Sequence, residues 1–299
     1  MAETCTVVAD VGSSSVKAGY AGDDIPCAIF PSVIQKYPHG LECVEASGSE
    51  QSSGEYGSAL THPVSRGEVR DWDQMEKLFN RIMEQIGVTS PDSASVLLTE
   101  SPKATMQERG KWAELLFETF RSPSICIGNS ASLSLFASGR TTGMVVECGA
   151  GLTSCVPVFE GLVLTHAAIS MDFGGQDITS SFRSILANHG VSIDFHDARM
   201  MKEKMAEVYV PSKDYSNGNG AGEMKRFELP DGTEVNVDKK IFTDCTEPLF
   251  RNDTVGFPNG LSNQAYESLR LCDDSIRKVL ANNVVVAGGT SLLPGISDR

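Results

Sequence analysis

Three short stretches of the chain combine strand-like residues with small or acidic residues that could bind a phosphate. They read VVADVGSSS (7–15), VVECGAGLT (145–153) and VVVAGGT (284–290). Glycine and serine suit turns whose backbone N–H groups approach a phosphate closely, because no large side chain intervenes. Asp10 and Glu147 each end a strand-like run and could hold Mg²⁺ through water, since that ion takes oxygen ligands and keeps several waters.

The first two stretches follow one plan: a β-branched pair, an acid, a small residue, a glycine and a small polar turn. An isolated turn of this kind is usually an ordinary hairpin, but three of them after buried strands form a more specific pattern. The two copies lie too far apart for a solenoid repeat. They predict two similar α/β domains that face each other across a cleft.

The bulk composition excludes some classes of function. The chain has 299 residues, and its 39 acids against 25 bases give a formal net charge of −14. Such a charge argues against a non-specific binder of nucleic acid or of an anionic membrane, since both require a basic field. No apolar run approaches the ~18 residues of a membrane span. The N-terminal residues lack the basic region of a signal peptide. The eight scattered cysteines show no zinc spacing and indicate reduced thiols.

Strand and helix patterns alternate along the chain, which predicts an α/β fold. Asp73 is predicted to cap a helix whose apolar residues repeat at three and four as far as Ile86. Further helices are predicted at 105–120, 131–138, 175–188, 197–208 and 263–281. Strands are predicted at 95–99 and 124–128, and a hairpin at 226–238 with Pro-Asp-Gly as its turn. The Ser/Gly-rich residues 47–58 are predicted to form a surface loop.

Several segments resemble the actin family, in the family's order and over nearly the whole chain. They include AGYAGDDIPCAIFPS (18–32), LSLFASGRTTG (133–143), VPVFEGLVLTHA (156–167) and VAGGTSLLPGISDR (286–299). The resemblance implies an actin-like two-lobed α/β fold, with duplicated ribonuclease-H-like domains around a cleft that holds ATP or ADP with Mg²⁺. The first lobe would span 1–137 and contain a small subdomain, shortened and rewritten, at 38–68. The second would span 138–299, without the C-terminal return to the first lobe that actin makes.

The resemblance also assigns residues of this chain to the nucleotide. The two phosphate loops would comprise Gly12, Ser13, Ser14 and Lys17 in the first, and Gly149, Ala150 and Gly151 in the second. The ribose and adenine contacts would come from Lys202, Glu203, Gly288, Gly289 and Thr290. Asp10 and Glu147 would hold the metal ion through water.

The departures from actin concentrate at the catalytic positions. Actin has an aspartate where this chain has Glu147, and a second aspartate where it has Ala150. The glutamine that positions the attacking water is replaced by Ser130, with Asn129 as a neighbouring stand-in, and a nearby histidine by Ser154. Because hydrolysis of a γ-phosphate depends on positioning, these changes predict at most a weak ATPase whose phosphate binding survives.

The sequence therefore predicts a divergent actin-related protein that binds ATP or ADP with weak or no hydrolysis. It would act as a structural subunit of a cytoskeletal or motor-associated complex, of the dynein, axonemal or dynactin type. Its partners would be other proteins, including actin or actin-related subunits, and neither nucleic acid nor membrane. The expected location is the cytoplasm and cytoskeleton, with the nucleus as a second choice.

Three alternatives stay open at this point. The first is a filament-forming actin-like ATPase, which the order of motifs favours. The rewriting of 38–68 opposes it, because in actin this segment enters the next subunit of the filament. The second is a nuclear actin-related subunit of a chromatin-remodelling complex. The third is a small-molecule kinase that uses Asp172 as its catalytic acid.

Overall fold

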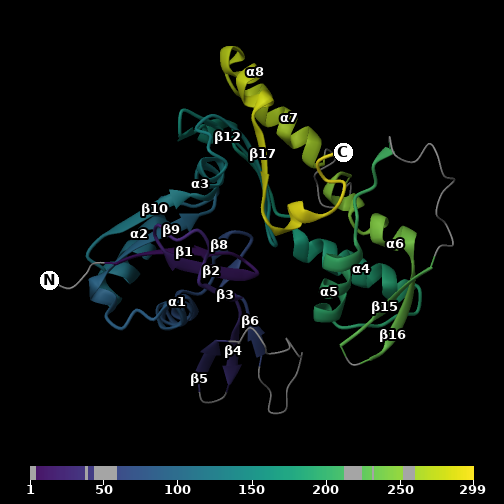
Figure 1. Ribbon diagram of the computed structural model, residues 1–299, viewed down its shortest axis with the longest axis horizontal. Helices are drawn as coiled ribbons and strands as arrows, with labels where there is room; N and C mark the ends of the chain where they lie inside the picture. Colours follow the sequence, from purple (N-terminus) through teal and green to yellow (C-terminus); the bar gives the residue numbers. More distant parts are fainter. Residues whose placement is uncertain (1–4, 38–39, 44–58, 212–223, 231, 252–259) are drawn as a thin grey trace. The chain divides into compact units, whose positions relative to one another are not determined.

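The computed structural model describes residues 5–37, 40–43, 59–211, 224–230, 232–251 and 260–299 (Figure 1). The chain divides into two compact units. The first comprises residues 1–141 and Glu160–Val163, and the second Thr142–Phe159 and Leu164–Arg299. The predicted boundary between residues 137 and 138 lies close to this division. The predicted loop at 47–58 and much of the 38–68 segment lie outside the described residues.

The first unit is built on a five-stranded sheet in the order β10-β9-β1-β2-β3. Its strands are β1 (Cys5–Val11), β2 (Ser15–Tyr20), β3 (Ala28–Pro31), β9 (Ala94–Glu100) and β10 (Ile125–Asn129). Strands β10, β9 and β1 run parallel, whereas β2 and β3 are antiparallel to their neighbours. Shorter strands are β4 (Ile34–Tyr37), β5 (Gly40–Cys43), β6 (Ala59–Thr61), β7 (Val64–Ser65) and β8 (Glu68–Val69). Strand β13 (Leu162–Val163) belongs to the other five-stranded sheet, where it pairs with β12 (Thr153–Phe159).

The helices of the first unit are α1 (Trp72–Ile86), α2 (Met106–Glu114) and α3 (Ser130–Ala137). Helix α1 buries the apolar face that its periodicity predicts, but the predicted cap was wrong. Asp71 caps the helix, because its Oδ1 accepts a hydrogen bond from Gln74 N at 3.0 Å. Asp73 lies in the first turn instead. The helix predicted over 105–120 changes after α2 to a π-helical turn at Leu115–Thr119.

The second unit repeats the strand arrangement of the first. Its main strands are β11 (Gly143–Cys148), β12 (Thr153–Phe159), β14 (Ile169–Met171) and β17 (Val284–Ala287). Strand β17 pairs parallel to β11, β12 pairs antiparallel to β11, and β14 antiparallel to β12. The order β17-β11-β12-β14 thus corresponds to β9-β1-β2-β3. This correspondence confirms the predicted α/β fold with two similar sheets.

The helices of the second unit are α4 (Gly175–Asn188), α5 (Phe195–Met205), α6 (Lys239–Asp244), α7 (Leu261–Leu271) and α8 (Asp274–Asn282). The predicted hairpin forms from β15 (Met224–Glu228) and β16 (Glu234–Asp238). Short 3₁₀ turns occupy Pro91–Ser93 in the first unit and Thr165–Ala167, Glu247–Leu249 and Gly289–Leu292 in the second. No helix of the described residues is long and apolar enough to cross a membrane.

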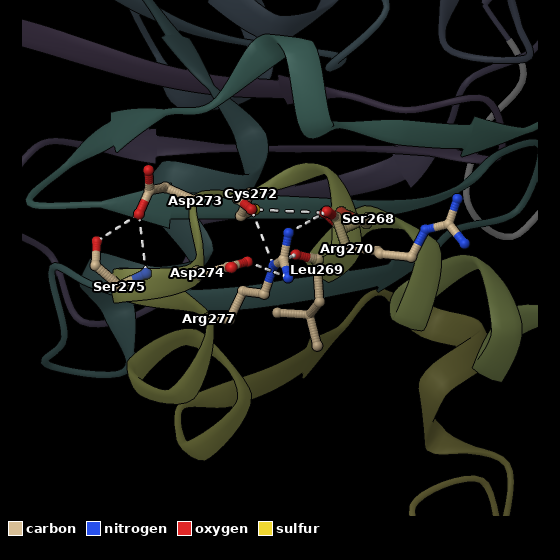
Figure 2. A network of polar contacts seen from close by, with 8 residues as sticks. All are labelled: Ser268, Leu269, Arg270, Cys272, Asp273, Asp274, Ser275 and Arg277. Atoms are coloured by element: carbon tan, nitrogen blue, oxygen red, sulfur yellow. Dashed lines mark hydrogen bonds and ion pairs between the residues drawn. The ribbon is translucent and has the colours of Figure 1, made fainter.

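The single helix predicted at 263–281 was wrong, because the chain turns between α7 and α8. Asp273 begins the second helix by accepting a hydrogen bond from Ser275 N at 2.9 Å. Figure 2 shows the guanidinium group of Arg277 against the last turn of α7. Its Nε donates to the carbonyl oxygens of Leu269 at 3.1 Å and Cys272 at 2.9 Å. Arg277 Nη2 also donates to the carbonyl oxygen of Arg270 at 2.6 Å, so one side chain donates to three carbonyl groups at the end of α7 and holds the corner.

Each unit has its own hydrophobic core. In the first unit, α1 packs against the sheet, and the rings of Phe79 and Phe120 meet edge to face with centroids 4.9 Å apart. In the second, Phe182 of α4 and Phe242 of α6 are fully buried, with ring centroids 5.4 Å apart. These cores fix the ends of the sheet strands from which the predicted site residues project.

Candidate functional site

The first glycine-bearing turn is a closed hairpin at the carboxyl end of β1. Gly12 N donates to Ser15 O at 3.1 Å, and a Cβ added at Gly12 would lie 3.2 Å from the same oxygen. Ser14 O accepts from Ser32 N at 3.0 Å, which ties the turn to the residue that follows β3. Ser13 is buried, and its Oγ accepts from Gly67 N at 3.4 Å. The turn is therefore held in place by neighbours on both sides.

Asp10, just before this turn, has a different partner on each carboxylate oxygen. Oδ1 accepts a hydrogen bond from Thr99 Oγ1 at 2.6 Å. Oδ2 lies 3.3 Å from Lys17 Nζ, directly across the β1–β2 ladder. The side chains of Asp10 and Lys17 are 43% and 48% exposed, so the pair remains open to solvent. The sequence analysis placed Asp10 and Lys17 in one candidate site, with different roles, and it assigned no role to Thr99.

Asn129 is the last residue of β10 and Ser130 follows it, on the same edge of the sheet. The ladder pairs Gly128 with Thr99, so these residues lie along the edge that carries Asp10. Asn129 caps α3, and its Oδ1 accepts from Ala131 N at 3.1 Å. Ser130 is the first residue of that helix. The amide oxygen of Asn129, the predicted stand-in for a water-positioning group, is thus already used for capping.

The second turn reproduces the first at the end of β11. Gly149 N donates to Leu152 O at 2.9 Å, and a Cβ at Gly149 would lie 3.1 Å from that oxygen. Glu147 pairs with Ser154 across the ladder, as Asp10 pairs with Lys17. Ser154 is only 1% exposed, so its hydroxyl cannot contact a bound ligand in this conformation.

The first residues of helix α4 hold the second turn in place through backbone hydrogen bonds. Gly149 O accepts from Gly175 N at 3.0 Å, and Ala150 O accepts from Gln176 N at 2.8 Å. Thr290 Oγ1 also donates to Gly149 O at 2.8 Å. The carbonyl groups of Gly149 and Ala150 are therefore both hydrogen-bonded within the protein.

Lys202 joins this arrangement from α5, whereas Glu203 does not. Lys202 is buried, and its Nζ donates to Gly175 O at 3.0 Å. Burial is the main cause that lowers the pKa of Lys202. Glu203 faces Arg199 instead, with Oε1 3.0 Å from Arg199 Nε, and is about half exposed. The predicted contact of Glu203 with adenine stays a prediction.

The third turn depends on Gly288. This residue has a φ of +90°, and a Cβ there would lie 2.4 Å from Cys148 O. The neighbouring Gly289 has no atom within 4 Å of such a Cβ. Gly288 thus lets the turn after β17 lie against the end of β11, where Thr290 reaches the second hairpin.

The second unit therefore brings three of its predicted site residues, Gly149, Lys202 and Thr290, together around Gly175. The sequence prediction missed Gly174 and Gly175 themselves. A Cβ at Gly174 would lie 2.5 Å from Ala150 O, and one at Gly175 would lie 2.6 Å from Thr290 Oγ1. The adjacent pair of glycines at the start of a helical pattern was the available signal, because such a pair permits close backbone approach.

The residues present fit a phosphate with a hydrated cation. Lys17 Nζ already places a positive charge against Asp10 Oδ2, so this oxygen accepts a cation in the observed conformation. Lys17, the serine hydroxyls and the turn N–H groups are suitable donors for phosphate oxygens. Among the described residues there is no group of three or more His, Cys, Asp or Glu side chains that could hold a metal directly.

The comparison with known families gives one finding. The family model described as Actin matches the chain over residues 1–198 and over residues 196–299. The two matches together cover the whole chain.

Proposed function

Because the chain belongs to the actin family, we propose that it is an actin-related protein that binds ATP or ADP with Mg²⁺ and hydrolyses ATP slowly or not at all. It serves as a structural subunit of a cytoskeletal or motor-associated complex. The observation that carries the proposal is the repeated hairpin, in which an acid precedes a turn closed by a glycine N–H. The closing bonds measure 3.1 Å at Gly12 and 2.9 Å at Gly149.

Different groups around the two hairpins bind the phosphates, the cation and the adenosine. Lys17 and the N–H and hydroxyl groups of Ser13 and Ser14 bind phosphate oxygens, and Asp10 and Glu147 hold the cation through water. Bound Mg²⁺ would neutralise part of the phosphate charge. Gly288 and Thr290 form the turn that receives the adenosine.

Weak hydrolysis follows from the residues near the turns. In-line attack on a γ-phosphate requires a side chain that positions water. Ala150 has no polar group, and the buried Ser154 cannot reach a ligand. Ser130, which stands where actin has its water-positioning glutamine, is a short side chain at the first position of α3. These three positions support a site that binds the nucleotide and lacks the group that orients the attacking water.

The role in a complex rests on the family and on the rewritten 38–68 segment. In actin this segment enters the next subunit, so its replacement favours heterologous partners over a filament. We propose cytoplasmic protein partners of the cytoskeleton, with no direct contact to nucleic acid or membrane. Sedimentation at micromolar concentration tests the filament alternative, because this proposal expects the protein to stay in the supernatant under actin-polymerising salt.

The decisive experiment measures nucleotide binding and turnover in the same preparation. The protein is purified, denatured, and any released nucleotide is identified by anion-exchange chromatography. Binding of a fluorescent ATP and single-turnover hydrolysis with Mg²⁺ are then measured beside actin. We expect bound ATP or ADP, and turnover well below that of actin. Turnover at the actin rate would contradict the weak-hydrolysis proposal, and failure to bind any adenine nucleotide would contradict the function itself.

A matched pair of lysine variants locates the phosphate contact. Lys17→Met removes the amine beside Asp10, and Lys103→Met removes one that lies 3.9 Å from Glu68 in the same unit. Only Lys17→Met should weaken nucleotide binding, by about 10-fold or more, since a lost hydrogen bond to a charged group is worth about 1.5–3 kcal/mol.

A further inference from the structure

We propose that Thr99 is a positioning residue, which fixes the carboxylate of Asp10 so that one of its oxygens faces a cation. The proposal rests on the nucleotide and Mg²⁺ binding proposed above, and it assigns a role to a residue outside the two phosphate turns. Thr99 would act through Asp10 and would not itself touch the metal ion or the nucleotide.

The first observation is the hydrogen bond that Thr99 makes. Its Oγ1 lies 2.6 Å from Asp10 Oδ1, a short distance typical of a hydroxyl that donates to an ionised carboxylate. Thr99 is half-buried on β9. The parallel β1–β9 ladder pairs Ala9 with Leu98, so the next residues of the two strands, Asp10 and Thr99, lie side by side. Both residues are thus held by a sheet, and a β-branched side chain has few alternative rotamers.

The second observation is that the other oxygen is held loosely. Lys17 Nζ lies 3.3 Å from Asp10 Oδ2, and the two side chains are 48% and 43% exposed. An ion pair that is so exposed contributes little and exchanges readily with solvent ions. Thr99 is a neutral donor, so it leaves the full negative charge on the carboxylate. Thr99 therefore fixes Oδ1 of Asp10. Oδ2 binds a hydrated cation once the amine of Lys17 has moved from it to a phosphate.

The second hairpin provides an internal comparison. Glu147 occupies the place of Asp10, and its parallel partner on β17 is Ala287, which has no hydroxyl group. The residue across the hairpin is Ser154, which is buried and carries no charge. Neither partner of Asp10 therefore has an equivalent at the same ladder positions around Glu147. The hydroxyl and the amine that flank Asp10 on the ladder are thus not repeated at these two positions beside Glu147.

The test uses three variants on the same strand. Thr99→Val removes the hydroxyl but keeps the shape, and Thr99→Ser keeps the hydroxyl. Ser95→Ala is the matched control, because it removes a hydroxyl from the other end of β9, where Ser124 Oγ donates to Ser95 Oγ at 2.8 Å. Binding of a fluorescent ATP is measured for each variant in Mg²⁺ and in EDTA. The metal dependence of the affinity is then the readout, independent of any turnover.

We expect Thr99→Val to weaken nucleotide affinity in Mg²⁺ by roughly 10–100-fold, the usual effect of removing a group that orients a metal ligand. Affinity in EDTA should not change, and Thr99→Ser and Ser95→Ala should resemble the unaltered protein. If Thr99→Val does not fold, the pair Thr99→Ala and Thr99→Ser carries the same comparison.

The outcomes separate this proposal from the proposed function. An unaltered protein that binds no nucleotide would overturn both. An unaltered protein that binds, together with a Thr99→Val variant of equal affinity in Mg²⁺, would overturn only the role of Thr99. A loss of equal size in Mg²⁺ and EDTA would also overturn it, because it would show a general effect on the turn.

Discussion

Replacement of Gly288 by alanine should destabilise the second unit and disturb its site. Gly288 has φ +90° and ψ 157°, a conformation that is essentially restricted to glycine. A Cβ there would also lie 2.4 Å from Cys148 O and 2.7 Å from Cys148 C. These atoms belong to the backbone of β11 and cannot rotate away as a side chain would. The substitution therefore combines backbone strain with a steric overlap.

The magnitude follows from these two effects. A residue held in such a conformation costs about 1–3 kcal/mol. Overpacking that shifts the backbone typically costs about 1–3 kcal/mol more. We therefore expect Gly288→Ala to lower the free energy of unfolding by about 2–6 kcal/mol. Gly289→Ala is the matched control, since nothing lies within 4 Å of its added Cβ, and changes at such unhindered positions usually stay within about 0.5 kcal/mol.

Urea unfolding followed by far-UV circular dichroism measures the difference, with fluorescent ATP binding recorded on the same samples. Because the chain has two compact units, separate transitions are expected to be resolvable, and only one of them should shift. The Gly288→Ala variant should also bind nucleotide more weakly, because Thr290 follows this turn and donates to Gly149 O. Equal unfolding midpoints for the two alanine variants would refute the assigned backbone geometry of the third turn.

Three further predictions concern stability and thiol chemistry. Gly110 lies within α2, and a Cβ added there meets no atom within 4 Å. Gly110→Ala should therefore raise the free energy of unfolding, measured in urea, by about 0.5–1 kcal/mol. A decrease would contradict the open environment of this position. Arg277→Ala should lower the free energy of unfolding by about 1–3 kcal/mol in the same assay, because the carbonyl groups at the corner in Figure 2 lose their guanidinium donor. An unchanged value would show that packing alone holds the corner. Alkylation by iodoacetamide near pH 8, read by mass spectrometry, should modify the exposed Cys27 and Cys126 first. Burial raises the pKa of three other thiols to about 12, so they stay protonated and should react only on unfolding: Cys148, Cys155 and Cys245. Rapid labelling of these in the native protein would contradict their burial.

The sequence predicted best those features that depend on local patterns. Residues 75–86 repeat at helical spacing and form one buried face of α1. The two hairpin turns were visible because glycine follows an acid and a strand-like run in both copies. The hairpin at Pro-Asp-Gly likewise formed where its turn residues indicated.

The errors arose where a choice between neighbouring residues is made by tertiary structure. Asp71 and Asp73 are both competent caps, and the extended backbone of Asp71, with φ −142° and ψ 112°, decides between them. The turn between α7 and α8 contains neither glycine nor proline, and it depends on Arg277 folding back onto α7. Thr99 was missed because its partner, Asp10, is 89 residues away along the chain. Only the parallel pairing of β1 and β9 brings the two together.

The two hairpins separate the groups that shape a turn from the groups that act on a ligand. Gly12 and Gly149 close their turns with backbone atoms alone, and both turns have the same geometry. The side chains differ: Lys17 corresponds to the buried Ser154 across the ladder. Since phosphate binding depends largely on turn N–H groups, it can persist when such side chains change. Turnover depends on a positioned water and is sensitive to each of them. Affinity and turnover are therefore expected to vary independently in this protein, and variants of the turn backbone should affect the first, while variants at Ser130 should affect only the second.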